Sequence, residues 1–130
     1  MNYKEYIAYQ GSAYTIEWYF DESGKSQAFE YVMNLNTTMQ TKVFYLLKRM
    51  ADVGKISDTT KFNNEGDKIY AFKPQPHRFL SFFVKDKKII ITNAFIKKTD
   101  KLPRNEKIKA VNYRENYLQR VKEGTYYEEN

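Results

Sequence analysis

Residues 68–109 read KIYAFKPQPHRFLSFFVKDKKIIITNAFIKKTDKLPRNEKIK, and this stretch decides the fold. Its apolar runs are bounded by turn-forming residues, a pattern typical of β-strands. Pro74 and Pro76 cannot donate hydrogen bonds to a sheet, so they separate the first strand from the second. The short polar segment after the second strand is typical of a hairpin turn. The stretch therefore predicts three consecutive strands, at residues 68–73, 78–84 and 88–96.

The same stretch carries the excess positive charge of the chain. It holds twelve Lys or Arg against three acids, a net charge of +9. Residues 1–67 hold seven basic and nine acidic residues, and residues 110–130 hold three and four, so these parts sum to −2 and −1. A basic block of this kind is the electrostatic footprint of a protein that binds a polyanion. We therefore expect a rim of Lys and Arg side chains that contacts RNA phosphates.

The rest of the chain adds one strand and three helices. Ser26 is a candidate N-cap, and Thr37 begins a TTMQ sequence that resembles a capping box. An apolar stripe at helical spacing follows Thr37, and Gly54 and Gly124 are typical helix stops. The predicted elements are a strand at 14–20, helices at 26–35 and 37–53, a loop at 55–67, and a helix from Pro103 to Gly124.

These elements predict an α+β domain with the order β-α-α-β-β-β-α. We expect a small antiparallel β-sheet covered on one face by an N-terminal helical hairpin and a C-terminal helix. The inward-facing residues of the last helix would be Ile108, Val111, Leu118 and Val121. A length of 130 residues is typical of a single domain, 1–130. Residues 1–13 would form an extra arm or a short strand, and residues 125–130 a frayed tail.

Rare residue types exclude several classes of function. The chain has no cysteine, which excludes disulfides and thiolate metal sites, and its single histidine argues against a histidine metal cluster. No apolar run approaches the roughly 20 residues of a membrane span. The N-terminus lacks the basic and apolar regions of a secretory signal. We therefore expect a cytoplasmic protein that uses no metal and no cofactor and does not bind a membrane.

The basic stretch contains four short motifs in a defined order. They are the strand end Phe72-Lys73, the run HRFLSFF from His77, the strand IIITNAF, and the sequence KKTDKLP that ends at Pro103. Together they resemble the RelE/ParE superfamily of toxins over about residues 14–120, most closely the phage-related, HigB-like branch. The resemblance implies a RelE-like fold and a toxin of a type II toxin–antitoxin system. Most members of the superfamily cleave mRNA, often in the ribosomal A site.

The resemblance also implies a site for metal-independent RNA cleavage by the 2′-OH. Arg78 matches the phosphate-binding arginine of the superfamily, and its planar guanidinium can hold two phosphate oxygens. Lys98 matches the catalytic arginine-type position, with Lys97 as its neighbour, and Lys73 would be a third cation. Adjacent strand residues point to opposite faces, so only one of Lys97 and Lys98 is expected to face the site. The candidate RNA-binding residues are Lys68, Lys97, Lys101 and Arg104.

The group that takes the 2′ proton stays open at this point. His77 is a candidate catalytic residue because its ordinary pKa lies near neutrality, although it adjoins Arg78 on the strand and neighbouring strand residues diverge. Two lysines of the best-known ribosome-dependent members are replaced here by Ile69 and Ala71, so the usual proton-transfer groups are missing. The candidates for the base are Lys68, Lys73, His77, Tyr113 and Tyr117.

Three functions fit the sequence. The first is an endoribonuclease toxin, an mRNA interferase whose partners are mRNA, the ribosome and a small helix-turn-helix antitoxin. The second is a non-catalytic RNA- or ribosome-binding module, which would use the same basic rim for affinity alone. The third is a gyrase poison of the ParE type, because membership in the superfamily does not determine the target.

Overall fold

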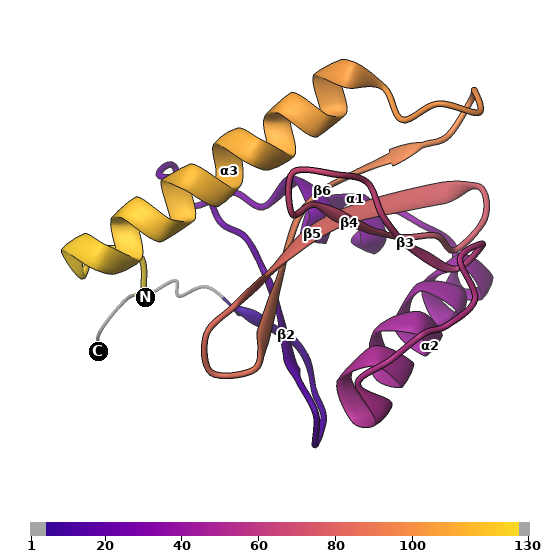
Figure 1. Cartoon of the computed structure of the whole chain (residues 1–130), viewed down its shortest axis with the longest axis horizontal. Helices are drawn as coiled ribbons and strands as arrows, with labels where there is room; N and C mark the ends of the chain where they lie inside the picture. The colour runs from indigo at the N-terminus through magenta and orange to yellow at the C-terminus, as the bar shows by residue number, and fades with distance from the viewer. Residues whose placement is uncertain (1–4, 128–130) are drawn as a thin grey trace.

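Six strands form one mixed sheet in the computed structural model, which describes residues 5–127. Their order across the sheet is β1-β2-β6-β5-β4-β3 (Figure 1). β2 and β6 run parallel, and the other neighbouring pairs are antiparallel. The strands are β1 Ile7–Gln10, β2 Thr15–Trp18, β3 Phe62–Asn64, β4 Tyr70–Phe72, β5 His77–Val84 and β6 Lys88–Ile96.

The strands predicted from the sequence are confirmed, with shorter bounds for some of them. β4, β5 and β6 are the three strands of the basic stretch, and β2 is the strand expected at residues 14–20. β1 shows that the segment before residue 13 contains a short strand, while residues 1–4 lie outside the described part. β3 was not expected, because it lies in a polar segment that reads as a loop.

The expectation of an antiparallel sheet is wrong at one pair of strands. After β2 the chain passes through two helices and three strands, and it then enters β6 in the same direction as β2. Thr15 is opposite Lys88, and Trp18 is opposite Ile91. Local periodicity identifies a strand but does not show which distant strand it pairs with. The sheet is therefore mixed, and the domain remains α+β.

The helices cover both faces of the sheet, so the prediction of a single covered face is wrong. α1 (Gln27–Met33) and α2 (Thr37–Val53) pack on one face, and α3 (Arg104–Glu123) packs on the other (Figure 1). Phe79 of β5 belongs to the core beneath α1 and α2, and its neighbour Leu80 belongs to the core beneath α3. Residues 77–82 are all buried, as is typical of a strand covered on both sides.

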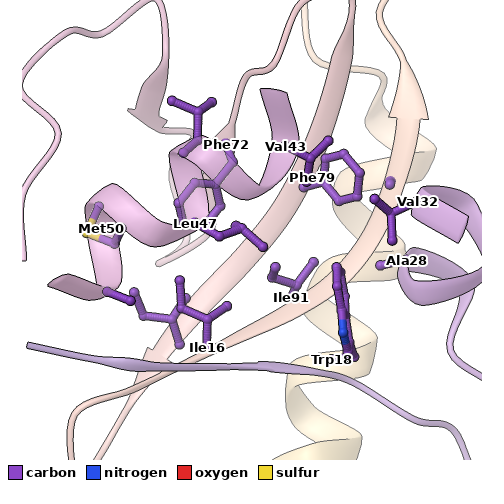
Figure 2. Packing of buried hydrophobic residues seen from close by; sticks show 14 of the residues in the cluster. Ile16, Trp18, Ala28, Val32, Val43, Leu47, Met50, Phe72, Phe79 and Ile91 are labelled. Atoms are coloured by element: carbon purple, nitrogen blue, oxygen red, sulfur yellow. The ribbon is translucent and has the colours of Figure 1, made fainter. Parts of the chain in front are cut away.

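The larger core lies between the sheet and the helical hairpin. Figure 2 shows Trp18 and Ile91 of the sheet beside Val32 of α1, with Leu47 of α2 in the same cluster. These side chains are almost fully buried. Burial of a side chain of this size contributes roughly 1.5–3 kcal/mol. The apolar stripe of α2 is therefore core, and it holds the hairpin against the sheet.

The start and the end of α2 are determined by local hydrogen bonds. Asn36 accepts a hydrogen bond from the backbone N–H of Met39 at 2.9 Å, so the N-cap is one residue earlier than the expected capping box at Thr37. Gly54 ends the helix with φ of 85°, a left-handed conformation that favours glycine. Ser26 caps α1 as predicted, since its Oγ accepts from the N–H of Phe29 at 3.3 Å.

Of the four residues expected to face inward from α3, Val111 is confirmed, and the other contacts with the sheet come from residues that aliphatic periodicity did not predict. Ala110 and Tyr117 are buried, and Val111 is partly buried. Large rings bury as much apolar surface as aliphatic side chains, so the tyrosine side of α3 faces the sheet. No helix within residues 5–127 is long and apolar enough to cross a membrane. The expected inward residues that are instead exposed, by 49%, 43% and 41%, are Ile108, Leu118 and Val121.

Tyr126 anchors the segment after α3, so the prediction of a frayed tail is wrong for this residue. Its side chain is 1% exposed. Its hydroxyl accepts a hydrogen bond from the N–H of Phe20 at 2.9 Å, and the guanidinium carbon of Arg120 lies 4.7 Å from its ring centre. Residues 128–130 of the predicted tail lie outside the described residues.

The turn between β1 and β2 lies tightly against the end of α2. A Cβ atom added to Gly11 would lie 2.3 Å from the carbonyl carbon and oxygen of Ala51. The same carbonyl oxygen accepts hydrogen bonds from the N–H groups of Ala13 and Tyr14, at 2.7 and 2.9 Å. The turn and the end of α2 therefore cannot move apart without losing these hydrogen bonds.

We predict that Gly11→Ala lowers the free energy of unfolding by about 1–3 kcal/mol, because the added methyl group overpacks this contact. Urea denaturation followed by circular dichroism measures the change. Gln10→Ala, at the preceding exposed position, is the control and should change stability by less than about 0.5 kcal/mol. Equal stabilities of Gly11→Ala and the wild type would contradict the close contact with α2.

Candidate functional site

Strand alternation brings three cations of the basic stretch to the α3 face of the sheet. Phe72 of β4 is opposite Phe79 of β5, and both rings belong to the core on the other face. Their neighbours Lys73 and Arg78 therefore point to the α3 face. Lys97 directly follows β6 and, by the same alternation, points to the same face of the sheet as Lys73 and Arg78. Lys73, Arg78 and Lys97 thus converge at one corner of the sheet.

These cations line one hollow of about 140 Å³, between the sheet and the segment that leads into α3. We call it the basic hollow. Its charged lining consists of four cations and two carboxylates, a net formal charge of +2 when all are ionised. They are Lys73, Arg78, Lys97, Lys101, Glu65 and Asp100. Since a phosphodiester carries one negative charge, the hollow suits an anionic ligand of this type.

Arg78 is deeply buried but keeps donors for a ligand. It is 5% exposed, and no carboxylate in residues 5–127 forms an ion pair with it. Its Nη1 donates to the side-chain oxygen of Gln75 at 3.3 Å and to the carbonyl of His77 at 2.9 Å. Nε and Nη2 of Arg78 form no hydrogen bond within residues 5–127. Since every fully buried side-chain nitrogen of the described residues has a partner, these two atoms must retain some contact with solvent. Burial lowers the pKa of Arg78, the charge of Glu65 opposes this, and an arginine remains protonated.

Lys73 lies between the arginine and a carboxylate. Its Nζ is 3.9 Å from Oε2 of Glu65 and donates to the carbonyl of Thr59 at 3.2 Å. Burial lowers the pKa of Lys73, the charge of Glu65 raises it, and the charges of Arg78 and Lys97 lower it, with a net decrease. A lysine with a lowered pKa releases its proton more readily than a solvated lysine.

Lys97, rather than Lys98, lines the hollow. Only one of the two adjacent lysines can face this side, and Lys98 is exposed outside the lining. The motif match had favoured Lys98 for the catalytic position. Lys101 also lines the hollow, while Lys68 and Arg104 are exposed and do not belong to its lining.

His77 lies on the face of the sheet opposite Arg78. Its Nδ1 is 2.6 Å from the hydroxyl oxygen of Tyr31 in α1, and the two rings pack edge to face. Burial lowers the pKa of His77, which favours the neutral imidazole. The candidate catalytic histidine is thus packed against α1 and does not line the hollow.

The two candidate tyrosines of α3 also lie away from the hollow. Tyr113 stacks on Tyr19, with ring centres 4.8 Å apart. Tyr117 is buried, its hydroxyl lies 2.7 Å from that of Tyr127, and burial raises the pKa of Tyr117. Neither ring belongs to the lining. Among the groups that the sequence suggested as the base, Lys73 is the one that the structure brings into the hollow.

Glu65 is a charged group of the hollow that the sequence analysis missed. It lies between β3 and β4, and its N–H donates to the carbonyl of Ile69 at 2.8 Å, which closes a tight turn. Its charge acts on both Lys73 and Arg78. No sequence motif marks Glu65, because only the pairing of β3 with β4 carries this turn to the cations. Asp100 was missed for a similar reason, since it lies in an irregular segment.

The hollow contains groups for anion binding and for proton transfer. Within the described residues, no group of three or more His, Cys, Asp or Glu side chains is placed to hold a metal ion. A guanidinium, ammonium groups and a carboxylate lie together instead. Such a set can bind a phosphate group and can both accept and donate protons.

A family model, described as Phage derived protein Gp49-like (DUF891), matches residues 30–115. The matched segment covers about two thirds of the 130 residues and includes every residue that lines the basic hollow. It begins within α1 and ends within α3, so β1 and β2 lie outside it. No curated protein matches the chain.

We predict that the pKa of Lys73 responds in opposite directions to two changes in the hollow. Lys97→Gln removes a repulsive charge and should raise this pKa, whereas Glu65→Gln removes an attractive charge and should lower it further. Titration of the Lys73 side-chain ¹³Cε signal by NMR measures both shifts. Lys98→Gln is the control and should leave the pKa unchanged. Equal shifts in Lys97→Gln and Lys98→Gln would show that the two lysines were assigned to the wrong faces.

Proposed function

The chain belongs to the Gp49-like family of phage-derived proteins, within the RelE-like toxins of toxin–antitoxin systems, and we propose that it is an mRNA interferase. In the proposed reaction, the 2′-oxygen of RNA attacks the adjacent phosphorus and the bond from phosphorus to the 5′-oxygen breaks. The products carry a 2′,3′-cyclic phosphate and a 5′-hydroxyl. The observation that supports this proposal best is the basic hollow, whose lining combines Arg78, Lys73 and Lys97 with the carboxylate of Glu65.

In this proposal, Arg78 binds the phosphate. Its Nε and Nη2 would donate to the two non-bridging oxygens of the scissile phosphate, as a guanidinium commonly does. Its low exposure of 5% supports this role, because few water molecules compete for the two donors that reach solvent. Lys97 and Lys101 would stabilise the additional charge that develops on the pentacovalent phosphorus.

In the same proposal, Glu65 and Lys73 transfer the protons. The carboxylate of Glu65 would take the proton from the 2′-OH, and the ammonium group of Lys73 would give a proton to the 5′-oxygen that leaves. The lowered pKa of Lys73 supports a role as the acid. The two groups lie 3.9 Å apart, beyond hydrogen-bond distance, so exchange with solvent would restore the protonation states of Glu65 and Lys73 after each cycle.

The cellular role follows from the family. Membership in a toxin–antitoxin family implies an antitoxin partner. We propose a small helix-turn-helix antitoxin that covers the positive surface, and charge complementarity would speed its association. We also propose action on the ribosome and assignment to the HigB-like branch, on the strength of the motif from Phe95 to Pro103.

We predict that Arg78→Ala abolishes toxicity and lowers the rate of RNA cleavage by about 10²–10³, the usual cost of losing a preorganised donor. Growth after induction and cleavage of a transcript bound to purified ribosomes measure the two effects. Arg78→Lys keeps the charge without the planar fork and should have an intermediate rate. Lys122→Ala, at an exposed position near the end of α3, is the control and should stay fully toxic. Circular dichroism confirms that each variant is folded.

Mapping of transcript ends after induction separates this function from its alternatives. New 5′-hydroxyl ends that disappear when the antitoxin is co-expressed support an mRNA interferase. Intact transcripts together with strongly salt-dependent RNA binding would identify a non-catalytic binding module. Intact transcripts with a loss of DNA supercoiling would identify a gyrase poison. Full toxicity of folded Arg78→Ala would rule out the basic hollow as the site.

We predict that Glu65→Gln lowers the cleavage rate by about 10²–10⁴, because the general base is lost. The rate should also decline at a lower pH on the alkaline side of the profile. The charge of Glu65 raises the pKa of Lys73. Removal of this charge therefore makes Lys73, the proposed acid, lose its proton at a lower pH. Glu115→Gln, at an exposed position of α3, is the control. An unchanged profile in Glu65→Gln would exclude this residue from proton transfer.

A further inference from the structure

A second concave surface runs along the outer side of α2, next to the basic hollow. Two hollows of about 540 and 490 Å³ adjoin there and share Tyr45, Leu46 and Lys61 in their linings. They lie between α2 and residues 55–61, which run beside this helix (Figure 1). α2 lines them over residues 41–53, a rise of about 18 Å. We call this elongated depression the α2 groove.

The lining of the α2 groove has five cations and one carboxylate, Asp58, which interacts electrostatically with Lys61. Four of them form no ion pair and no side-chain hydrogen bond with any residue in the described part of the chain: Lys42, Arg49, Lys55 and Lys61. Asp58 is the carboxylate of the lining, and its Oδ1 accepts from the N–H and the hydroxyl of Thr60, at 2.9 and 2.6 Å. Lys48 of the same helix differs, because it pairs with Asp52 at 2.8 Å. The unpaired cations of α2 thus lie on the side that faces the groove.

Tyr45 lies where the two hollows meet. It is 59% exposed, and within residues 5–127 its ring contacts no other ring or cation and its hydroxyl forms no hydrogen bond. Other tyrosines, such as Tyr19 and Tyr126, are packed in the core. An exposed ring among cations is the arrangement on which nucleic-acid bases stack.

Lys73 connects the α2 groove to the basic hollow. It lines both depressions. Its Nζ donates to the carbonyl of Thr59, and its backbone N–H donates to the carbonyl of Lys61 at 2.8 Å, so it is attached to the wall of the groove. The two depressions therefore meet at Lys73.

We propose that the α2 groove binds the single-stranded RNA that flanks the cleaved phosphate. Its cations contact the sugar–phosphate backbone, and the ring of Tyr45 stacks on a base. This inference rests on the proposed function, which supplies the RNA, and it adds a substrate-binding surface outside the basic hollow. The observations favour RNA over a protein because the lining combines unpaired cations with one open ring and continues into a phosphate-binding site.

An RNA that cannot be cut separates binding from cleavage. A single-stranded 2′-O-methyl RNA of about 12 nucleotides lacks the attacking hydroxyl, so the wild-type protein can be titrated with it by fluorescence anisotropy. Removal of three cations in Lys42→Ala/Arg49→Ala/Lys61→Ala should weaken binding about tenfold. It should also reduce the slope of log K against log salt by about 2, at roughly 0.7 for each lost phosphate contact.

Two further variants distinguish stacking from charge. Tyr45→Ala should weaken binding roughly tenfold and leave the salt slope unchanged, because the ring carries no charge. Lys122→Ala is the matched control, since it removes an exposed cation from α3. It should change neither the affinity nor the slope.

Each outcome decides one of the two proposals. Unchanged RNA affinity and salt slope in the triple variant would overturn the groove assignment, even if the wild type cleaves RNA. Loss of neutralisation by the antitoxin with unchanged RNA affinity would also overturn it and would identify a protein-binding surface. Absence of cleavage by the wild type would overturn the proposed function instead, while groove-dependent RNA binding would still support the groove.

Discussion

The alternation of side chains across β4, β5 and β6 decides which charged groups meet. Lys73, Arg78 and Lys97 share one face of the sheet, and His77 packs against α1 on the other. A shift of one residue in the pairing would exchange the two sets. Phe79 and Leu80 oppose such a shift, because each is fully buried in a different core. The apolar packing of both faces thus determines the composition of the site.

Much of the sheet could be predicted from the sequence because its signals are local. Turn formers and apolar runs bound the strands, and these are the features that periodicity detects. Alternation also predicted that only one of Lys97 and Lys98 faces the site. It could not show which one, because that depends on the face that α3 covers. The presence of Glu65 in the site could not be predicted either, because its position depends on how the turn between β3 and β4 packs.

The two-sided arrangement was missed because polar residues conceal it. β5 is buried from His77 to Phe82, yet the run includes a histidine, an arginine and a serine, which do not look like core residues. Arg78 lines the basic hollow, and His77 packs against α1, where Tyr31 contacts its ring nitrogen. A site that gathers positive charge in a partly buried corner lowers stability, and proteins tolerate such local conflicts mainly where they bind or react. The departure from a simple strand pattern therefore coincides with the site.

β2 lies outside the segment that matches the family, but it pairs with the central strand β6 and contributes Ile16 and Trp18 to the main core. Tyr126, from beyond the other end of the match, donates its hydroxyl to the carbonyl of Trp18 at 3.4 Å. A fragment trimmed to residues 30–115 would leave one side of β6 without hydrogen-bonding partners, and bare strand edges promote aggregation. The smallest self-sufficient unit is thus longer than the shared segment. A shortened chain intended to fold on its own therefore has to retain β2 and the segment around Tyr126.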